Sequence, residues 1–268
     1  VDFCYITLKK AISMSKDLYY LSPAQLERIQ PYFPLSHGVA RVDDRKVLSG
    51  IIYVIKNGLQ WKDAPSEYGP YKTLYNRFIR WSRMGIFNKI FMELSRKNGS
   101  VEQLMIDSTH LKAHQTAASL LKKGSIPVIG RTKGGLNTKL HAVCDQQGKP
   151  IALALTCGQT SDYKGAAMLL DHLPQASCLL ADRGYDASWF RNALHHKGIT
   201  PCIPSRKCRK KPVDYDKILY KQRHKVENMF GRIKDWRRIA MRYDRCAHTF
   251  FSANALLVAL SFILINES

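Results

Sequence analysis

Two aspartates each follow a short apolar run that is typical of a buried strand. Asp107 comes directly after LMI, and Asp182 comes directly after CLLA. A carboxylate at the edge of a buried strand loses hydration, which is costly unless a cation lies nearby. Carboxylate oxygens are ligands that Mg²⁺ prefers, and two such ions about 4 Å apart can serve phosphodiester chemistry. Either aspartate alone could instead cap a turn, but together they predict a divalent-metal site.

A third acid, Glu227, stands among basic residues in YKQRHKVENMFGRIK. At about 100° per helical residue, Tyr220, Arg223, Glu227 and Lys234 fall on one stripe of a helix. This stripe predicts that Glu227 completes the metal site. The alternative is a surface ion pair between Arg223 and Glu227, which stabilises a helix by only about 0.2–0.5 kcal/mol.

The elements that must position these acids follow a mixed pattern. Five short apolar segments bounded by Gly, Pro or polar residues predict strands, and two helical segments lie between the later ones. Three strands in succession followed by alternation with helices indicate a mixed α/β sheet. The segments are EQLMIDSTHLKAH, LNTKLHAVCD, IALALTCGQ, SCLLADRGY and ITPCIP, with helices at YKGAAMLLDHL and ASWFRNALHHKG, a Gly- and Lys-rich loop at 121–135, and a long basic helix from about 215 to 236.

The segment before this sheet is helical. Ser22-Pro23 predicts a helix start, and two later helices, the second bearing Arg77 and Arg80, resemble a helix-turn-helix that docks on DNA. A plain helical bundle with a basic helix is the alternative. The predicted division is an extension over 1–20, a helical DNA-binding domain over 21–97 and a catalytic domain over 98–268. Met14 is the first methionine, so the true start is open.

The charge of the chain favours a polyanionic partner. Its 268 residues include 42 Lys and Arg against 21 Asp and Glu, a formal net charge of +21. Residues 205–245 hold 15 basic against 5 acidic residues, so +10 of that charge lies in this segment. A solvated helix face normally mixes charge signs. We therefore expect this segment, Lys210 and Lys211 included, to bind DNA phosphates.

Cysteine usage and hydropathy place the chain in the cytoplasm. Seven cysteines without a CxxC pair favour reduced thiols over a disulfide framework or a zinc ribbon. The most apolar stretch, Phe250–Ile265, is shorter than the roughly 20 residues that span a bilayer, and it includes Asn254. A buried C-terminal helix is the better interpretation, and no membrane partner is expected.

These residues together resemble the acidic motifs of insertion-sequence DDE transposases. The family's third motif is Tyr-x2-Arg-x3-Glu-x6-Lys, and Tyr220, Arg223, Glu227 and Lys234 match its spacing. MIDST around Asp107 and LLADRGYD around Asp182 look like the first and second motifs. The segment GLQWKDAPSEYGPYKTLYNRF is similar to the small domain that precedes the catalytic core in one branch, so the resemblance covers about residues 20 to 265.

The resemblance implies an RNase H-like core, with Asp107 on the first strand, Asp182 after the fourth and Glu227 on a later helix. It implies two Mg²⁺ or Mn²⁺ ions held by these acids, water attack at the element's ends, and attack of the freed 3′-OH on target DNA. Arg223 and Lys234 would hold phosphates, and Tyr220 would position the DNA. The implied partners are double-stranded DNA, as terminal inverted repeats and target, and a second copy in a homodimer. A nucleoid-associated cytoplasmic location follows.

Three other functions stay open. Tyr220 could be the covalent nucleophile of a tyrosine recombinase, a mechanism that does not need three carboxylates. A metal-dependent nuclease or resolvase would cleave DNA without joining it. A DNA-binding regulator that has lost catalysis is the third. Among rival carboxylates, Asp186 could support the second motif, whereas Asp145 and Asp162 are interpreted as turn or cap residues.

Overall fold

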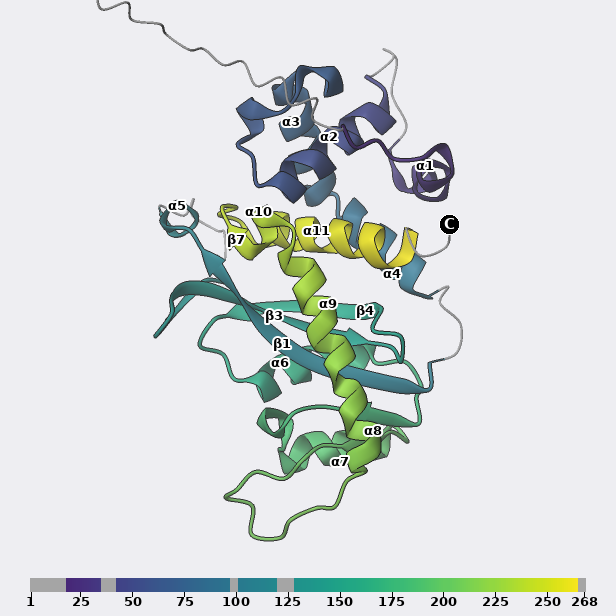
Figure 1. Cartoon of the computed structure of the whole chain (residues 1–268), viewed down its shortest axis with the longest axis vertical. Coiled ribbons are helices and arrows are strands. Elements are labelled where there is room, and N and C mark those ends of the chain that lie inside the picture. The colour runs from purple at the N-terminus through teal and green to yellow at the C-terminus, as the bar shows by residue number, and fades with distance from the viewer. Residues whose placement is uncertain (1–17, 35–41, 97–100, 120–127, 265–268) are drawn as a thin grey trace, which may run out of the picture.

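The structure is a computed structural model that describes residues 18–34, 42–96, 101–119 and 128–264. The predicted extension therefore lies outside the described residues up to position 17, as does Cys4. A cluster of helices forms one end of the molecule and a twisted sheet with flanking helices forms the rest (Figure 1).

Within the described residues four α-helices precede the sheet; three match the predicted helices, and the fourth, Ile86–Arg96, is additional. The side chain of Ser22 caps the first helix by accepting a hydrogen bond from the Gln25 backbone, and Gly58 (φ 70°) ends the second. Residues 58–70 separate the second and third helices and contain two 3-10 turns, so the pair lacks the three- or four-residue turn of a helix-turn-helix. The helices are α1 (Pro23–Ile29), α2 (Asp44–Asn57), α3 (Tyr71–Arg83) and α4 (Ile86–Arg96).

The five predicted strands are all present, and two short ones join them in a sheet of seven strands within the described residues. Strand β1 pairs antiparallel with β3 and parallel with β5; β6 extends the parallel side, while β2 and β4 both pair with β3. Strand β2 lies inside the predicted loop, so Asp182 follows the fifth strand rather than the fourth. The strands are β1 (Gln103–Ala113), β2 (Gly130–Thr132), β3 (Gly135–Cys144), β4 (Pro150–Cys157), β5 (Cys178–Leu180), β6 (Thr200–Cys202) and β7 (Met241–Arg242).

Side chains along β1 alternate between two hydrophobic clusters, one on each face of the sheet. Leu104 and Ile106 belong to the cluster packed on helices α6 (Asp162–Leu169) and α7 (Ser188–His196). Met105 and Leu111 belong to the other cluster, which includes residues of α9 (His224–Lys234) and α11 (Ala247–Val258). Figure 1 shows α9 lying across the sheet. Odd-numbered residues of β1 therefore face α9, and even-numbered ones face α6.

The long basic helix predicted from 215 to 236 is divided. The Asp216 side chain caps α8 (Lys217–Tyr220), a 3-10 turn covers Lys221–Arg223, and α9 then runs to Lys234. Because Asp216 accepts from two backbone amides, the helical segment begins two residues later than predicted. A short helix, α10 (Arg237–Ala240), follows.

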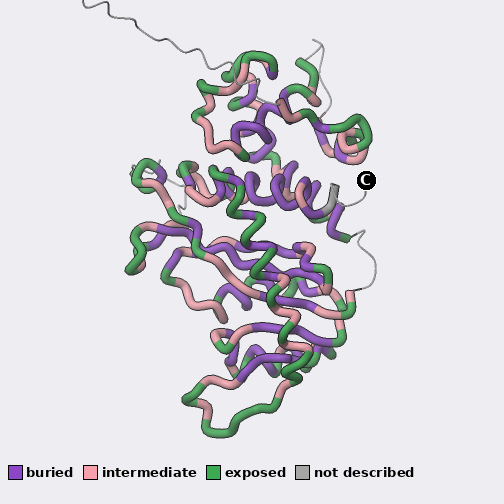
Figure 2. Tube along the Cα trace, in the orientation of Figure 1, coloured by how far each residue is buried: buried purple, intermediate pink, exposed green. Residues whose placement is uncertain are grey.

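The apolar C-terminal segment is a buried helix, as predicted. Helix α11 and a π-helical turn (Ala259–Leu264) lie between the sheet and the N-terminal helices, and Figure 2 shows α11 among the buried parts of the chain. One hydrophobic cluster contains residues of α2, α3, α4, α11 and the sheet. Among the described residues no helix combines the length and apolarity needed to cross a membrane.

Candidate functional site: carboxylates on β1, after β5 and on α9

Asp107 lies near the middle of β1 on the face covered by α9. Its Oδ1 accepts a hydrogen bond from the backbone amide of Ser108 at 2.8 Å. Its Oδ2 accepts from Nη1 of Arg223 at 2.7 Å. Burial raises the pKa of Asp107, Arg223 lowers it, and the nearby charge of Asp182 raises it again, so the net pKa is above its usual value. A second cation beside this carboxylate would offset both the burial and the repulsion.

Asp182 lies just beyond the end of β5, the strand that pairs parallel with β1. In the parallel pairing of β1 and β5, Met105 lies opposite Leu180, and each aspartate comes two residues later. Oδ1 of Asp182 accepts from the backbone amide of Gly184 at 2.8 Å, so the carboxylate caps the 3-10 turn that follows. The turn-capping role that the sequence left open is thus real, and it coexists with a position beside Asp107.

Glu227 projects from α9 with 56% of its side chain exposed. The guanidinium of Arg223 binds Asp107 with one nitrogen and Glu227 with the other. Burial alone lowers the pKa of Arg223, but the charge and hydrogen bond of Asp107 outweigh it and raise the pKa. The ion pair between Arg223 and Glu227 is therefore one half of a bridge that joins α9 to β1.

The three carboxylates are hard oxygen donors and so fit Mg²⁺ or Mn²⁺ in kind. In the described part of the chain, however, no three His, Cys, Asp or Glu side chains are grouped closely enough to hold one ion. The expectation that Asp107, Asp182 and Glu227 converge on one point is not met here. The reason is that Arg223 lies between Asp107 and Glu227 and carries the positive charge at that place.

Tyr220 and Lys234 do not lie on the one continuous helix that the sequence predicts, because a 3-10 turn separates α8 from α9. Tyr220 ends α8, is partly buried, and packs its ring against that of Tyr215 at 5.3 Å. Burial raises the pKa of Tyr220, which makes its hydroxyl harder to ionise. Lys234 ends α9 with an exposed side chain.

The basic loop after β6 is held to the turn that carries Asp182. Asp186, whose side chain is fully buried, accepts hydrogen bonds from Arg191 at 2.7 Å and from Arg209 at 2.8 Å. The Arg206 side chain donates to the backbone oxygens of Arg183 (3.0 Å) and Gly184 (2.5 Å). Burial raises the pKa of Asp186, but hydrogen bonds from Arg209, the Arg206 backbone amide and Arg191 bring it down to about 2, so it stays charged. Asp186 thus supports the second motif, as the sequence suggested.

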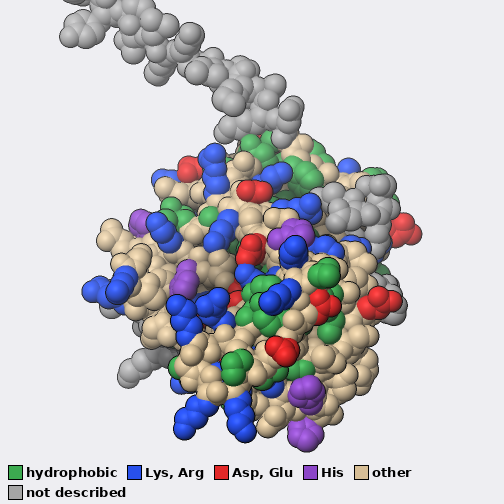
Figure 3. Space-filling view, turned by 60° about the horizontal axis from the view of Figure 1, so that its bottom comes forward, with side chains coloured by type: hydrophobic (Ala, Val, Ile, Leu, Met, Phe, Trp, Pro, Cys, Tyr) green, Lys and Arg blue, Asp and Glu red, His purple; other side chains and the backbone are tan. Residues whose placement is uncertain are grey.

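Lys210 and Lys211 lie in this loop with exposed side chains. The loop projects from the end of the molecule remote from α1–α3 (Figure 1). Viewed toward that end, Lys and Arg side chains are spread over the face and flank the few acidic ones (Figure 3). Phosphate binding by this surface is electrostatically favoured.

The structure separates the two arginines predicted to dock DNA. Arg77 is paired with Asp44 of α2 at 2.7 Å, and its guanidinium lies 5.2 Å from the Trp81 ring centroid. It therefore links α2 to α3, and a phosphate would have to compete with Asp44. Arg80 is exposed.

Two rival carboxylates have different roles. Asp145 is a turn residue, as predicted, and accepts from the backbone amides of Gln147 and Lys149. Asp162 is not the turn or cap residue that the sequence predicts: it accepts side-chain hydrogen bonds from Ser108 and Lys139. The sequence signal for this contact is Ser108, whose hydroxyl directly follows Asp107.

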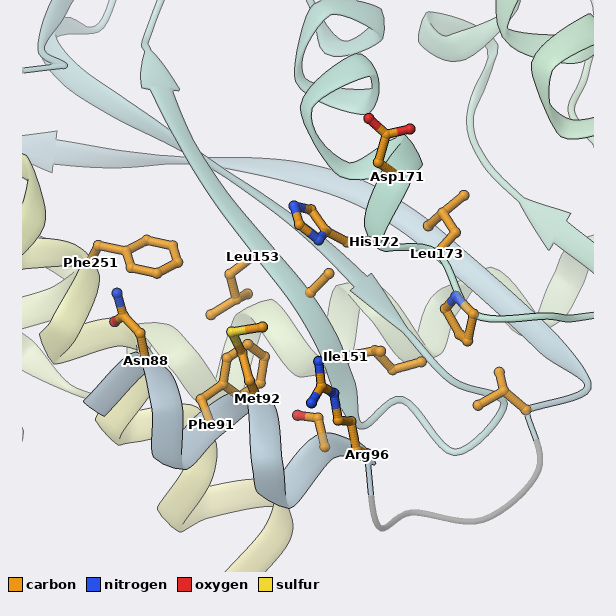
Figure 4. A pocket seen from close by; sticks show the side chains of 14 residues that line it. Asn88, Phe91, Met92, Arg96, Ile151, Leu153, Asp171, His172, Leu173 and Phe251 are labelled. Carbon is orange, nitrogen blue, oxygen red and sulfur yellow. The ribbon is translucent and has the colours of Figure 1, made fainter. Parts of the chain in front are cut away.

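A cavity of about 560 Å³ lies apart from these acids, between α4 and β4. Phe91, Met92, Leu153 and Phe251 give it a largely apolar lining (Figure 4). Such a lining does not suit a metal ion or a phosphate.

Two protein-family models match this chain, one over the N-terminal helices and one over the sheet and its flanking helices. Residues 99–262, more than half of the chain, match the family described as "Transposase DDE domain". The chain belongs to the DDE transposase family. Residues 21–91 of this transposase match a second family model, "Putative transposase of IS4/5 family".

Bacterial relatives agree with this assignment. The transposase is 33% identical over 126 residues to the "Putative transposase for insertion sequence element IS6501" of Brucella ovis, covering 47% of this chain and 97% of that one. It is 31% identical over 137 residues to the corresponding protein for IS402 of Burkholderia cepacia, covering 44% and 63%. The chain is thus a transposase of the insertion-sequence type.

A solved structure shares the fold. The transposase superposes on the piggyBac transposase, solved as a synaptic complex with hairpin DNA, with a TM-score of 0.56 at 10% sequence identity. The match covers 91% of this chain and 70% of that one. The predicted fold, an RNase H-like mixed sheet with flanking helices preceded by a helical region, is confirmed.

Proposed function

We propose that this transposase cleaves DNA at the ends of an insertion sequence and joins those ends to target DNA. One observation carries the proposal: Asp107 on β1 lies beside Asp182, which directly follows the parallel strand β5, and Arg223 links Asp107 to Glu227 of α9. Acids on a strongly basic surface suit chemistry on a phosphodiester held among cations.

Asp107, Asp182 and Glu227 would hold two Mg²⁺ or Mn²⁺ ions. The ions would supply charge to the attacking and leaving oxygens of an in-line displacement. Arg223 is placed to compensate Asp107 and Glu227 before DNA arrives. A bidentate guanidinium also suits phosphate, so DNA binding would give Arg223 a second partner beside the scissile bond.

The remaining residues would have one of two roles, binding DNA phosphates or recognising the terminal repeat. Lys210, Lys211 and Lys234 have exposed ammonium groups that would contact phosphates without reading sequence. Arg80 on α3 would help select the terminal inverted repeat. Two copies would pair the two ends as a homodimer, and chromosomal DNA as substrate would place the protein at the nucleoid in the cytoplasm.

The test is an end-labelled duplex that carries the element's terminal repeat, incubated with the protein and a circular target. Strand cleavage and joined products that vanish with a chelator and return with Mg²⁺ or Mn²⁺ are expected. Cleavage without joined products would indicate a nuclease. Binding without cleavage in either metal would indicate a regulator and overturn the proposal.

A further inference from the structure

Ser108 connects the candidate metal site to the opposite face of the sheet. Because side chains alternate along a strand, Asp107 faces α9 while Ser108 faces α6. The backbone amide of Ser108 donates to Asp107, and its hydroxyl donates to Oδ1 of Asp162 at 2.5 Å. One residue thus ties the carboxylate of Asp107 to that of Asp162 through the strand.

Asp162 is held as a charged acceptor rather than as a helix cap. It is the first residue of α6, after the N-cap residue Ser161, and 30% of its side chain is exposed. Lys139 donates to the same Oδ1 at 3.1 Å and to the Thr160 carbonyl at 2.7 Å. Burial raises the pKa of Asp162, but the hydrogen bonds from Ser108 and Lys139 lower it overall.

The second oxygen of Asp162 packs against the turn that carries Asp182. A Cβ atom placed on Gly184 would lie 3.2 Å from Oδ2 of Asp162 and 2.8 Å from Oδ1 of Asp182. A side chain at Gly184 would therefore crowd both carboxylates, which shows how closely Oδ2 of Asp162 approaches this turn. Oδ1 of Asp162 binds Ser108 and its Oδ2 lies close to Gly184. Asp162 therefore lies against both segments that carry Asp107 and Asp182.

Helix α6 lies close against the sheet at this point. A Cβ atom on Gly165, one turn after Asp162, would lie 2.2 Å from Nδ1 of His141 on β3. His141 is paired with Ser108 across the sheet and donates to or accepts from Thr156 at 2.8 Å. The absence of a side chain at Gly165 thus lets the first turn of α6 rest directly on the sheet beneath Ser108.

We propose that Asp162 is a positioning residue that sets the separation of Asp107 and Asp182. The inference rests on the proposed function, since that separation matters only if both aspartates hold metal ions. In this role Asp162 would act without contacting DNA or the reacting atoms. It acts through Ser108 on one side and through the backbone of Gly184 on the other, as residues that hold a metal's ligands in place do.

The experiment compares Asp162→Ala with Asp162→Asn, which retains an oxygen acceptor for Ser108 and Lys139. Calorimetric titration of Mn²⁺ into the protein without DNA measures metal binding directly, and Mn²⁺-dependent cleavage of the terminal duplex gives the concentration for half-maximal rate. Asp162→Ala should weaken Mn²⁺ binding and shift that concentration by about 10–100-fold. Asp162→Asn should stay near wild type in Mn²⁺ binding, and both variants should retain DNA binding.

Asp171→Ala is the matched control, because Asp171 is an exposed aspartate just beyond α6. It should leave Mn²⁺ binding at the wild-type value. If Asp162→Ala fails to fold, Ser108→Ala removes the same hydrogen bond by deleting one hydroxyl, and it should weaken Mn²⁺ binding in the same direction.

The outcomes separate this inference from the proposed function. Wild-type Mn²⁺ binding in Asp162→Ala or, should that variant not fold, in Ser108→Ala would overturn the positioning role and leave the metal site standing. Equal losses in Asp162→Asn and Asp162→Ala would also overturn it, because charge rather than hydrogen bonding would then matter. A wild-type protein that neither binds Mn²⁺ nor cleaves DNA would remove both proposals.

Discussion

Arg223 binds Asp107 and Glu227 at the same time, so replacing either carboxylate leaves its half of this ion-pair bridge without a charged partner. Neutral isosteres keep the hydrogen-bond acceptors and remove only the charge that a divalent ion needs. Asp107→Asn, Asp182→Asn and Glu227→Gln should each lower the rate of Mg²⁺-dependent cleavage by more than about 100-fold. That loss exceeds the loss expected from mutating a residue that only positions a metal ligand.

DNA binding by the same three variants should be retained or tightened, because removing an acid lowers repulsion of phosphate. Rate measurements under single-turnover conditions and a gel-shift titration distinguish the two effects. Near-wild-type cleavage by any one variant would show that its residue is not a metal ligand.

Tyr220 provides a second residue-scale prediction. Its ring packs on Tyr215, and burial raises the pKa of its hydroxyl, neither of which suits a nucleophile. Tyr220→Phe should therefore keep measurable cleavage, since the ring is preserved. A denaturing gel of end-labelled DNA, run with and without protease, tests this. A protease-sensitive shifted band that disappears in Tyr220→Phe would identify a covalent recombinase mechanism instead.

At the scale of elements, the basic loop between β6 and α8 is anchored by Asp186 while its lysines are left exposed. Replacing Lys210 and Lys211 together by Ala should weaken binding to all DNA sequences. The slope of log affinity against log salt should fall by about 0.9 for each phosphate that the protein no longer neutralises. The Arg replacements at both positions preserve charge and should restore the slope. An unchanged slope in the Ala variant would mean that other basic residues bind the phosphates.

Helix α3 makes a separate prediction because its two arginines are in different surroundings. Arg80→Ala should reduce the preference for the terminal repeat over random duplex at equal stability. Arg77→Ala should instead lower the free energy of unfolding by about 1–3 kcal/mol, because its charged hydrogen bond to Asp44 is removed. Competition binding and thermal denaturation measure the two. If Arg80→Ala lost the same affinity for the terminal repeat and for random duplex, Arg80 would not recognise the sequence of the repeat.

At the scale of the whole molecule, α11 packs against both the N-terminal helices and the sheet. Leu257 is completely buried in this shared cluster. Leu257→Ala should cost about 2–5 kcal/mol, and it should shift a single unfolding transition rather than one of two. Calorimetry checks this. Two transitions, with only one moved by the substitution, would show that the predicted division at residues 97 and 98 also separates two folding units.

The amino-acid sequence by itself determined the local elements and the kind of chemistry. Strand and helix periods placed β1, β3, β4, α6 and α7 within a few residues of their observed bounds, because hydrophobic periodicity is a local property. The carboxylates and the +21 charge likewise follow from residue types alone. The break after Tyr220 and the short strand β2 escaped prediction, since single 3-10 turns and three-residue strands leave little periodic signal.

Tertiary structure alone decided which side chains share a partner. Arg223 reaches Asp107 across 116 residues, Asp162 reaches Ser108 across 54, and Arg77 reaches Asp44 across 33. None of these pairs has a characteristic sequence spacing, because they depend on the order of strands and on which face of the sheet each helix covers. The alternation of β1 sends Asp107 toward α9 and Ser108 toward α6, and only the packed sheet shows that Arg223, just before α9, and Asp162, at the start of α6, are their charged partners.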